Sequence, residues 1–176
     1  TGEVAKKLGR ALAPSIRRVG VFMEVKMPEI AEMVKRGVID TVQLHAPCAF
    51  EVSEAQISEL RRATKGAELQ IIRAFGVSDT TLLHEAERTS ADLVLLDNPR
   101  GGSGEAFDHA LLEGFARPYI LSGGLTPENV APLLERWRPW GVDVSSGIEV
   151  AGQKNRDKMI AFLKAVRMFD GEGIGR

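Results

Sequence analysis

The stretch Tyr119-Ile120-Leu121-Ser122-Gly123-Gly124-Leu125-Thr126-Pro127 contains the repeating unit of this chain in compact form. A short apolar run ends at a pair of glycines. Thr126-Pro127 then has the residue types of a helix start, a capping hydroxyl followed by proline. Over residues 127–137 the apolar side chains recur on one stripe at helical spacing. The stretch therefore predicts a strand, a tight loop and a helix in succession.

The same unit recurs along the whole chain. The further apolar runs lie at residues 19–22, 41–44, 69–72, 93–96 and 142–144. Their near-continuous hydrophobicity is typical of strands that are buried on both faces. Ser53 and Ser78-Asp79 have the residue types of helix starts, and helices are expected over about 2–13, 54–64 and 155–168. Alternating strands and helices predict an α/β fold with a parallel sheet and right-handed crossovers.

Two architectures fit about six strands and seven helices. A doubly wound open sheet is expected to carry a GxGxxG motif directly after its first strand, and none follows Phe22. The other is a (β/α)8 TIM barrel that lacks its first strand, first helix and second strand. Two added units would bring the chain to about 225 residues, which is within the usual barrel range. We therefore expect residues 1–176 to form a single (β/α) barrel domain that is incomplete at its N-terminus.

Composition excludes several classes of protein. The 176 residues include 23 basic and 24 acidic side chains and are 44% hydrophobic. This balance argues against a nucleic-acid or membrane-surface partner and against a disordered chain. Cys48 is the only cysteine, which excludes an internal disulfide framework. No apolar run approaches the roughly 20 residues that cross a bilayer. We expect a cytoplasmic domain.

Two glycine-containing loops follow neighbouring strands. Paired glycines at Gly123-Gly124 allow backbone N–H groups to approach a ligand, and the helix start beyond them favours an anion. The stretch Gly141-Val142-Asp143-Val144-Ser145-Ser146-Gly147-Ile148-Glu149 again leads from a strand into hydroxyls and a glycine. Ordinary glycine turns are the alternative for either loop alone. Together they predict a phosphate site, as barrels build after their last two strands.

A carboxylate at the end of another apolar run is a candidate general acid. In Leu95-Leu96-Asp97, burial is expected to raise the pKa of the Asp97 carboxyl and keep a proton available. The glycine-rich segment Gly101-Gly102-Ser103-Gly104 that follows suits a mobile flap over a substrate. The alternative is that Asp97 only caps its own loop and that the glycines provide slack.

Together these motifs resemble the phosphoribosylanthranilate isomerase family, the (β/α)8 enzymes of tryptophan biosynthesis. The matching stretches occur in the family's order over nearly the whole chain: 19–22, 42–45, 95–97, 101–104 with Phe107-Asp108, 121–130, and 141–149 with Gly152. The resemblance implies an Amadori rearrangement of N-(5-phosphoribosyl)anthranilate to its 1-deoxyribulose isomer, with no cofactor and no metal. A general acid protonates the ribose ring oxygen, and a base then removes the C2 proton from the opened Schiff base.

The resemblance also implies roles for individual residues. Asp97 aligns with the family's general acid, and His45 and Asp143 align with positions that line the substrate pocket. The backbone at the phosphate-binding positions would hold the substrate phosphate. These positions are Gly123, Gly124, Ser146 and Gly147. The implied partner is a small phosphoribosyl compound.

Several residues depart from the family pattern. The family's general base is a cysteine in a Lys-x-Cys-Gly motif at the end of the first strand, and this chain has no such motif. Cys48 follows a later strand and is expected to be a loop thiol, in a segment where Ala46-Pro47 is atypical. His109 stands where the family commonly has tryptophan, and it and His84 are expected at the surface.

Three functional hypotheses follow. The first is that the chain is the C-terminal three-quarters of a phosphoribosylanthranilate isomerase, with the missing strands preceding Thr1. The second is a non-catalytic phosphate-binding remnant of that barrel. The third is a related phosphosugar isomerase, which would share the two phosphate loops but not the pairing of Leu95-Leu96-Asp97 with the glycine-rich segment.

Overall fold

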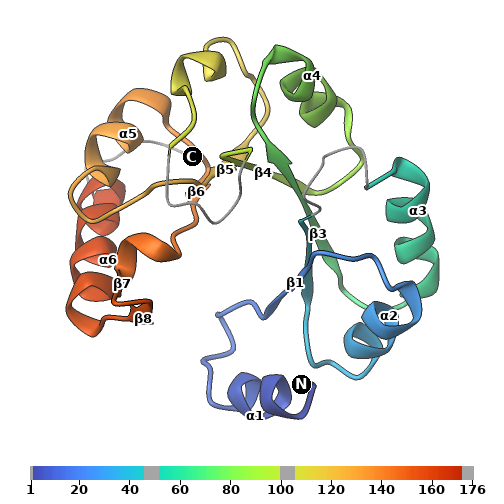
Figure 1. Cartoon of the computed structure of the whole chain (residues 1–176). Helices are drawn as coiled ribbons and strands as arrows, with labels where there is room; N and C mark the ends of the chain where they lie inside the picture. Colours follow the sequence, from blue (N-terminus) through green and yellow to red (C-terminus); the bar gives the residue numbers. More distant parts are fainter. Residues whose placement is uncertain (1, 46–51, 100–105, 172–176) are drawn as a thin grey trace. The chain divides into compact units, whose positions relative to one another are not determined.

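The computed structural model describes residues 2–45, 52–99 and 106–171. Figure 1 draws the whole chain with its helices and strands labelled. Its residues group into two compact units. Unit 1 comprises residues 1–75 and 88–94, and unit 2 comprises residues 76–87 and 95–176. The hydrogen-bonded strands follow chain order from β1 to β6 in one sheet. This order is the one expected of successive strand–helix units with short connections. The predicted single domain stays a prediction.

Unit 1 contains three strands and three helices. The strands are β1 (Val19–Phe22), β2 (Thr41–Leu44) and β3 (Gln70–Gly76), and the helices are α1 (Gly2–Arg10), α2 (Met27–Lys35) and α3 (Glu54–Ala63). The strands pair in parallel, with Val19 opposite Thr41 and Thr41 opposite Gln70. Parallel pairing confirms the predicted strand–helix alternation in this unit.

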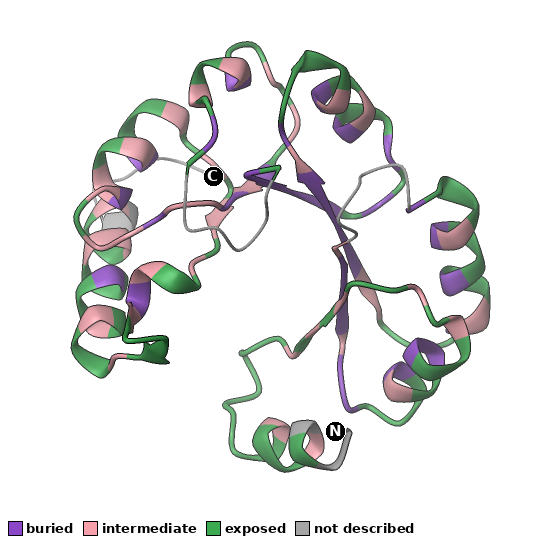
Figure 2. Cartoon of the chain, viewed as in Figure 1, coloured by how far each residue is buried: buried purple, intermediate pink, exposed green. Residues whose placement is uncertain are grey.

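The core of unit 1 lies between the strands and helices α2 and α3. Ile30 and Val34 of α2 and Ile57 of α3 pack with Val42 and Ile71 of the strands. Ser53 begins α3 with a reciprocal capping box, in which its hydroxyl accepts from the Gln56 amide, so the predicted helix start is confirmed. The buried residues run along β2 and β3 (Figure 2).

The first strand differs from the prediction. Val19 and Val21 of β1 are 44% and 57% exposed, so this strand is not buried on both faces. The burial pattern alternates along the strand, because Phe22 packs against the core of unit 1 while Val19 and Val21 lie on the opposite face. Helix α1 also ends at Arg10, earlier than predicted, and leaves Val4 and Leu8 exposed.

Unit 2 continues the strand–helix pattern with β4 (Leu93–Asp97), which begins in unit 1. The remaining elements are α4 (Thr80–Arg88), η2 (His109–Leu112), β5 (Tyr119–Leu121), α5 (Val130–Trp137), β6 (Gly141–Val142), η3 (Ser146–Ile148), β7 (Glu149–Val150), β8 (Gln153–Lys154) and α6 (Arg156–Gly171). Strands β5 and β6 pair in parallel. Helices α5 and α6 pack against each other (Figure 1).

Two elements of unit 2 were not predicted as they occur. Between β4 and β5 the described residues form one helical element, the 3₁₀ turn η2, which Asp108 caps. Gly114, at φ +83°, follows it. The antiparallel hairpin β7–β8 turns through Ala151 and Gly152, both at positive φ. An Ala-Gly pair is an uncommon hairpin signal, and strands of two residues have no detectable periodicity.

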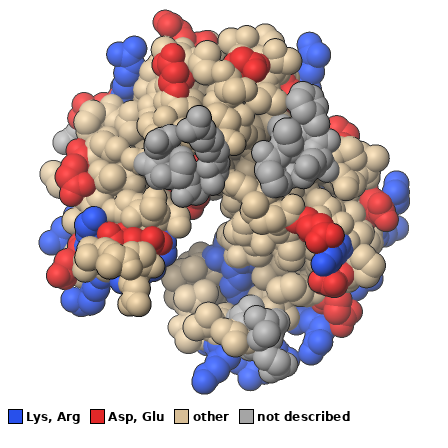
Figure 3. Space-filling model, viewed as in Figure 1, with Lys and Arg blue, Asp and Glu red and all other residues tan. Residues whose placement is uncertain are grey.

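The surface carries both signs of charge, as expected from the nearly equal numbers of basic and acidic side chains in the sequence. Lys and Arg are interspersed with Asp and Glu over the face seen in Figure 3. Among the described residues, no helix is both long enough and apolar enough to cross a membrane.

Candidate acid and phosphate site

Asp97 is the last residue of β4 and lies in a buried position. It is 7% exposed, and every residue of the strand is buried. The Asn98 amide donates to Asp97 Oδ1 at 2.8 Å, and the Val77 amide donates to the Asp97 main-chain carbonyl at 2.9 Å. The carboxylate therefore caps the residue after it, as one alternative expected, while it also occupies the buried strand end that a general acid requires.

The loop after β5 depends on its two glycines. Gly123 and Gly124 have φ values of +88° and +63°, a region that a side chain disfavours. The Asn129 side chain stabilises the same loop with two hydrogen bonds. Its Oδ1 accepts from the Thr126 amide at 2.8 Å, and its Nδ2 donates to the Gly124 carbonyl at 2.8 Å. Helix α5 begins only after this turn, with Asn129 at the N-cap, so the predicted cap at Thr126 is three residues early.

The loop after β6 meets the loop after β5 main chain to main chain. A Cβ added at Gly147 would overlap the carbonyl oxygen of Leu125. Only glycine permits this approach, so the two predicted phosphate loops are in direct contact within unit 2. Val144 and Ser145 connect β6 to η3, in which Gly147 lies.

The loops offer backbone donors to a ligand. Within the part of the chain that the structure describes, none of the N–H groups at the four predicted phosphate positions donates to a protein acceptor. These positions are Gly123, Gly124, Ser146 and Gly147. All are exposed or partly exposed. Clustered main-chain N–H groups of this kind form concave sites that favour anions.

Asp143 is joined to the loop after β5. Ser122 Oγ donates to Asp143 Oδ2 at 3.2 Å, and the Asp143 amide donates to the Leu121 carbonyl at 2.9 Å. The Ser122 amide donates to the Leu96 carbonyl at 2.9 Å, next to Asp97 in sequence. The ends of β4, β5 and β6 are thus connected by hydrogen bonds, and they bring Asp97, Ser122 and Asp143 to the same edge of the sheet.

His45 belongs to unit 1, where it follows β2. Its amide donates to the Phe22 carbonyl at 2.9 Å, and its Nδ1 lies 3.4 Å from Gln43 Nε2. The predicted loop residues Ala46-Pro47 and Cys48 lie outside the described residues, as does the predicted flap at 101–104.

The other two histidines have different surroundings. His84 is exposed, as predicted, with Nδ1 at 3.6 Å from Glu87 Oε2. His109 is partly buried, so the prediction of a surface residue is wrong: its ring packs edge-on against Phe107 with centroids 4.7 Å apart. Burial lowers the pKa of His109. Among the described residues, no cluster of three or more His, Cys, Asp or Glu side chains is placed to hold a metal ion.

A cavity of about 480 Å³ lies between α5, β6 and α6. It is lined mainly by apolar side chains, including Leu134, Trp140, Phe162 and Val166. A lining of this kind offers few donors to a phosphate group, so the cavity is distinct in chemistry from the two glycine loops.

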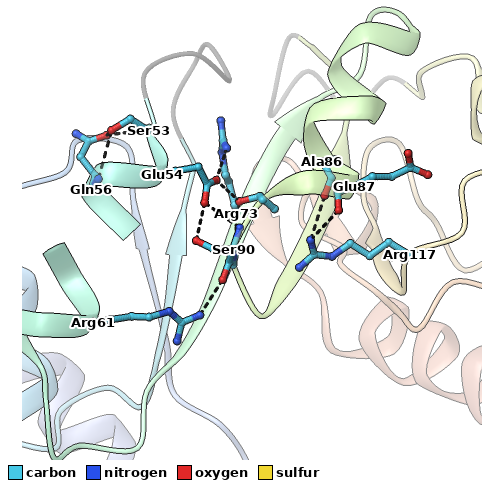
Figure 4. A network of polar contacts seen from close by, with 11 residues as sticks. Ser53, Glu54, Gln56, Arg61, Arg73, Ala86, Glu87, Ser90 and Arg117 are labelled. Atoms are coloured by element: carbon cyan, nitrogen blue, oxygen red, sulfur yellow. Dashed lines mark hydrogen bonds and ion pairs between the residues drawn. The ribbon is translucent and has the colours of Figure 1, made fainter. Parts of the chain in front are cut away.

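A polar network in unit 1 was not predicted from the sequence (Figure 4). Arg73 of β3 is 2% exposed, and its Nη1 lies 3.0 Å from Glu54 Oε1. Thr89 Oγ1 and the Ser90 amide donate to the same carboxylate at 2.6 and 2.8 Å. Burial raises the pKa of Glu54, but the hydrogen bonds from Ser90 and Thr89 and the charge of Arg73 outweigh it, so the pKa lies below its ordinary value.

The fold and the loops define a class of protein, an α/β enzyme of the (β/α)8 barrel type with a candidate phosphate site after β5 and β6, the last two strands of the parallel sheet. The family model described as N-(5'phosphoribosyl)anthranilate (PRA) isomerase matches residues 2–165. The chain belongs to this family of tryptophan-biosynthesis isomerases.

Relatives and solved structures agree with this assignment. The N-(5'-phosphoribosyl)anthranilate isomerase of Lactiplantibacillus plantarum is 38% identical over 161 residues, which are 90% of this chain and 71% of the relative. The crystal structure of the Thermus thermophilus phosphoribosyl anthranilate isomerase matches with a TM-score of 0.81 at 30% identity. The match covers 96% of this chain and 80% of that one.

A further solved structure contains a ligand. It is a phosphoribosyl anthranilate isomerase in complex with reduced 1-(o-carboxyphenylamino)-1-deoxyribulose 5-phosphate, here called rCdRP. It matches with a TM-score of 0.76 at 30% identity and covers 96% of this chain and 80% of that one. That protein therefore binds a phosphate-bearing sugar derivative on the same fold.

Proposed function

We propose that this chain catalyses the isomerisation of N-(5'-phosphoribosyl)anthranilate, with Asp97 as general acid. The observation that carries the proposal is the contact of the two glycine loops at Gly147 and Leu125, on the same sheet edge as the buried Asp97. Family membership indicates the reaction, and the contact between the loops supports a phosphate site on the sheet edge that carries Asp97. The substrate is a small phosphoribosyl compound, and the reaction has its place in tryptophan biosynthesis.

The residues divide the work between binding and proton transfer. The N–H groups at Gly123, Gly124, Ser146 and Gly147 hold the phosphate of the substrate, because main-chain N–H donors on contacting loops match its oxygens. Asp97 protonates the ribose ring oxygen as the ring opens to a Schiff base. Asp143 contacts the substrate, and Ser122 holds the Asp143 carboxylate by its hydrogen bond. A substrate-binding role for His45 of unit 1 rests on its alignment with the family.

The family's Lys-x-Cys-Gly motif, whose cysteine removes the C2 proton, has no counterpart in residues 1–176. General acid–base groups contribute about 10²- to 10⁴-fold to a rate. Residues 1–176 assayed alone are therefore expected to turn over more slowly than a chain that carries that base, by about that factor. The single cysteine, Cys48, is consistent with a reducing compartment, from which we infer a cytoplasmic location.

The test measures binding and turnover on the same protein. Calorimetric titration with rCdRP is expected to show binding, with inorganic phosphate as a competitor. Consumption of N-(5'-phosphoribosyl)anthranilate, followed by anthranilate fluorescence, is expected to show slow turnover. Asp97→Asn is expected to abolish this turnover while the affinity for rCdRP changes by only a few-fold, because a general acid acts in the transition state.

Two results would overturn parts of the proposal. Binding of rCdRP without any turnover would favour the non-catalytic phosphate-binding alternative. A large loss of rCdRP affinity in Asp97→Asn would show that Asp97 holds the loop in place and is not the acid.

A further inference from the structure

Lys154 contacts the loop that carries two of the proposed phosphate donors. It lies in β8, opposite Glu149 of β7 in the hairpin register. Its Nζ donates to the Ser145 carbonyl at 2.9 Å, to Ser145 Oγ at 3.1 Å and to Glu149 Oε1 at 2.7 Å. The three ammonium protons thus have three acceptors, two of which belong to Ser145.

The hairpin places Lys154 at this loop by its own geometry. The turn through Ala151 and Gly152 reverses the chain after β7, so β8 returns antiparallel to β7 and Lys154 lies opposite Glu149, which follows Ser145 closely in the chain. The Asn155 amide closes the hairpin on the Ile148 carbonyl at 2.8 Å. The position of the ammonium group is therefore fixed by the backbone of the hairpin and by the Glu149 carboxylate.

The bond to Ser145 has a consequence for the next peptide group. The Ser145 carbonyl and the Ser146 N–H belong to one planar trans peptide, in which they point in opposite directions. When Lys154 holds the carbonyl on its own side, the Ser146 N–H is directed to the other side. The Ser145 carbonyl also accepts from the Ile148 amide at 3.4 Å, but that contact is long compared with the charge-assisted bond.

We infer that Lys154 is a positioning residue for the phosphate loop, which directs the Ser146 N–H by holding the Ser145 carbonyl. The inference rests on the proposed function, because it assumes that this loop binds phosphate. Glu149 neutralises much of the ammonium charge at 2.7 Å, so the main effect of Lys154 is on the orientation of the peptide and not on long-range attraction.

Lys154→Met tests the inference, with Lys158→Met as matched control. Lys158 lies on α6 and its Nζ donates to the Glu149 carbonyl at 3.1 Å, so the control removes one ammonium group that contacts the same hairpin but no bond to Ser145. Binding of rCdRP and of inorganic phosphate is measured by calorimetry. We expect about tenfold weaker binding in Lys154→Met, as is typical for loss of a charge-assisted hydrogen bond, and a change below twofold in Lys158→Met.

Two further measurements separate positioning from charge and from folding. In Lys154→Met the difference from the unmutated protein is expected to persist at 0.5 M salt, roughly, where the attraction between exposed charges is screened. In Lys154→Met the amide resonance of Ser146 is expected to lose most of its phosphate-induced shift. In Lys154→Arg part of that shift is expected to be retained. Unchanged thermal unfolding of Lys154→Met would show that the hairpin still folds.

The outcomes are distinguishable. If the unmutated protein and Lys158→Met bind both probes and Lys154→Met binds them equally well, the role of Lys154 is wrong and the phosphate site stands. If the difference disappears at high salt, Lys154 contributes charge only and the positioning role is overturned. If the unmutated protein binds neither probe, the proposed phosphate site itself fails and the inference fails with it.

Discussion

The polar network around Glu54 in unit 1 differs from the glycine loops of unit 2 in whether its hydrogen-bonding groups have partners within the protein. The Glu54 carboxylate accepts from Arg73, Thr89 and Ser90, all within one unit. In the described part of unit 2, by contrast, the N–H groups at Gly123, Gly124, Ser146 and Gly147 have no protein acceptor. Satisfied groups in a protein hold structure together, and unsatisfied donors gathered in one place are available to a ligand.

This difference predicts that the two regions affect different measurements. Substitutions in the Glu54 network change the free energy of unfolding and leave phosphate affinity alone. Substitutions in the loops change phosphate affinity more than stability. A change that broke this separation would show that a region had been assigned the wrong role.

The largest expected effect is that of Gly147→Ala on phosphate binding. The added methyl group overlaps the Leu125 carbonyl, so the two loops must separate. Overpacking of this kind costs up to about 3 kcal/mol, which corresponds to about 100-fold in affinity for rCdRP. Gly141→Ala is the control, because its Cβ would meet Ile120 at an ordinary 3.8 Å and is expected to change affinity by less than twofold. Calorimetry measures the affinity for rCdRP. Equal losses of affinity in both variants would show that the contact between the loops is not part of the phosphate site.

Gly124→Val tests the other loop. Gly124 has φ +63°, where a β-branched residue is strained, and a side chain there also blocks the approach of the phosphate to the main chain. We expect phosphate-bearing ligands to bind at least about tenfold more weakly, since strain of this kind costs roughly 1–3 kcal/mol. Unchanged affinity for inorganic phosphate would place the phosphate elsewhere.

The Glu54 network is tested by Glu54→Gln, which removes the Glu54 carboxylate from its contact with the buried Arg73. Loss of one partner of a buried pair costs about 3–5 kcal/mol, and we expect about 2 kcal/mol here because the Glu54 side chain is 47% exposed. Urea unfolding measures the change, and Glu59→Gln on the same helix is an exposed control. Affinity for rCdRP should stay within twofold. A loss of affinity as large as the loss in Gly147→Ala would contradict the separation of roles.

The pH dependence of stability gives a smaller effect with a definite sign. The pKa of Glu54 lies below its ordinary value of 4.5 in the folded protein. Its contribution to stability is therefore complete above that ordinary value and is lost as the pH falls through the lower folded pKa. Urea midpoints of the unmutated protein should fall more steeply below pH 4.5, roughly, than those of Glu54→Gln. Parallel pH profiles would show that Glu54 does not carry this linkage.

Much of the fold follows from the sequence, because the strands and their loops carry local signals. The runs at residues 19–22 and 41–44 are β1 and β2 without a change of boundary. Strand β3 was predicted at 69–72 but continues to Gly76, since Arg73 interrupts the apolar pattern in the sequence. In the fold Arg73 is buried and contacts Glu54 of α3, a partner distant in sequence that no local pattern reveals.

The site was predictable to a similar extent and for a similar reason. Glycine pairs and hydroxyls after apolar runs are local signals, and the structure brings the loops that contain Gly123 and Gly147 into contact. Lys154 was not among the predicted residues, because its relation to Ser145 depends on a hairpin of two-residue strands. Ser122 was also missed, although its place between Leu121 and Gly123 in the loop signature gave a hint of its contact with Asp143.

The smallest effect sharpens the comparison within unit 2 itself. The Tyr119 hydroxyl donates to the Trp137 carbonyl at 3.0 Å, and burial raises the pKa of this tyrosine to about 12. Tyr119→Phe removes one satisfied hydrogen bond and is expected to lower the free energy of unfolding by about 1 kcal/mol, with unchanged affinity for rCdRP. Tyr119 lies in β5, directly before the phosphate loop. If Tyr119→Phe lowered the affinity for rCdRP while Glu54→Gln did not, the effect of a substitution on affinity would depend on its distance from the phosphate loop. It would then not depend on whether the substituted group is hydrogen-bonded within the protein.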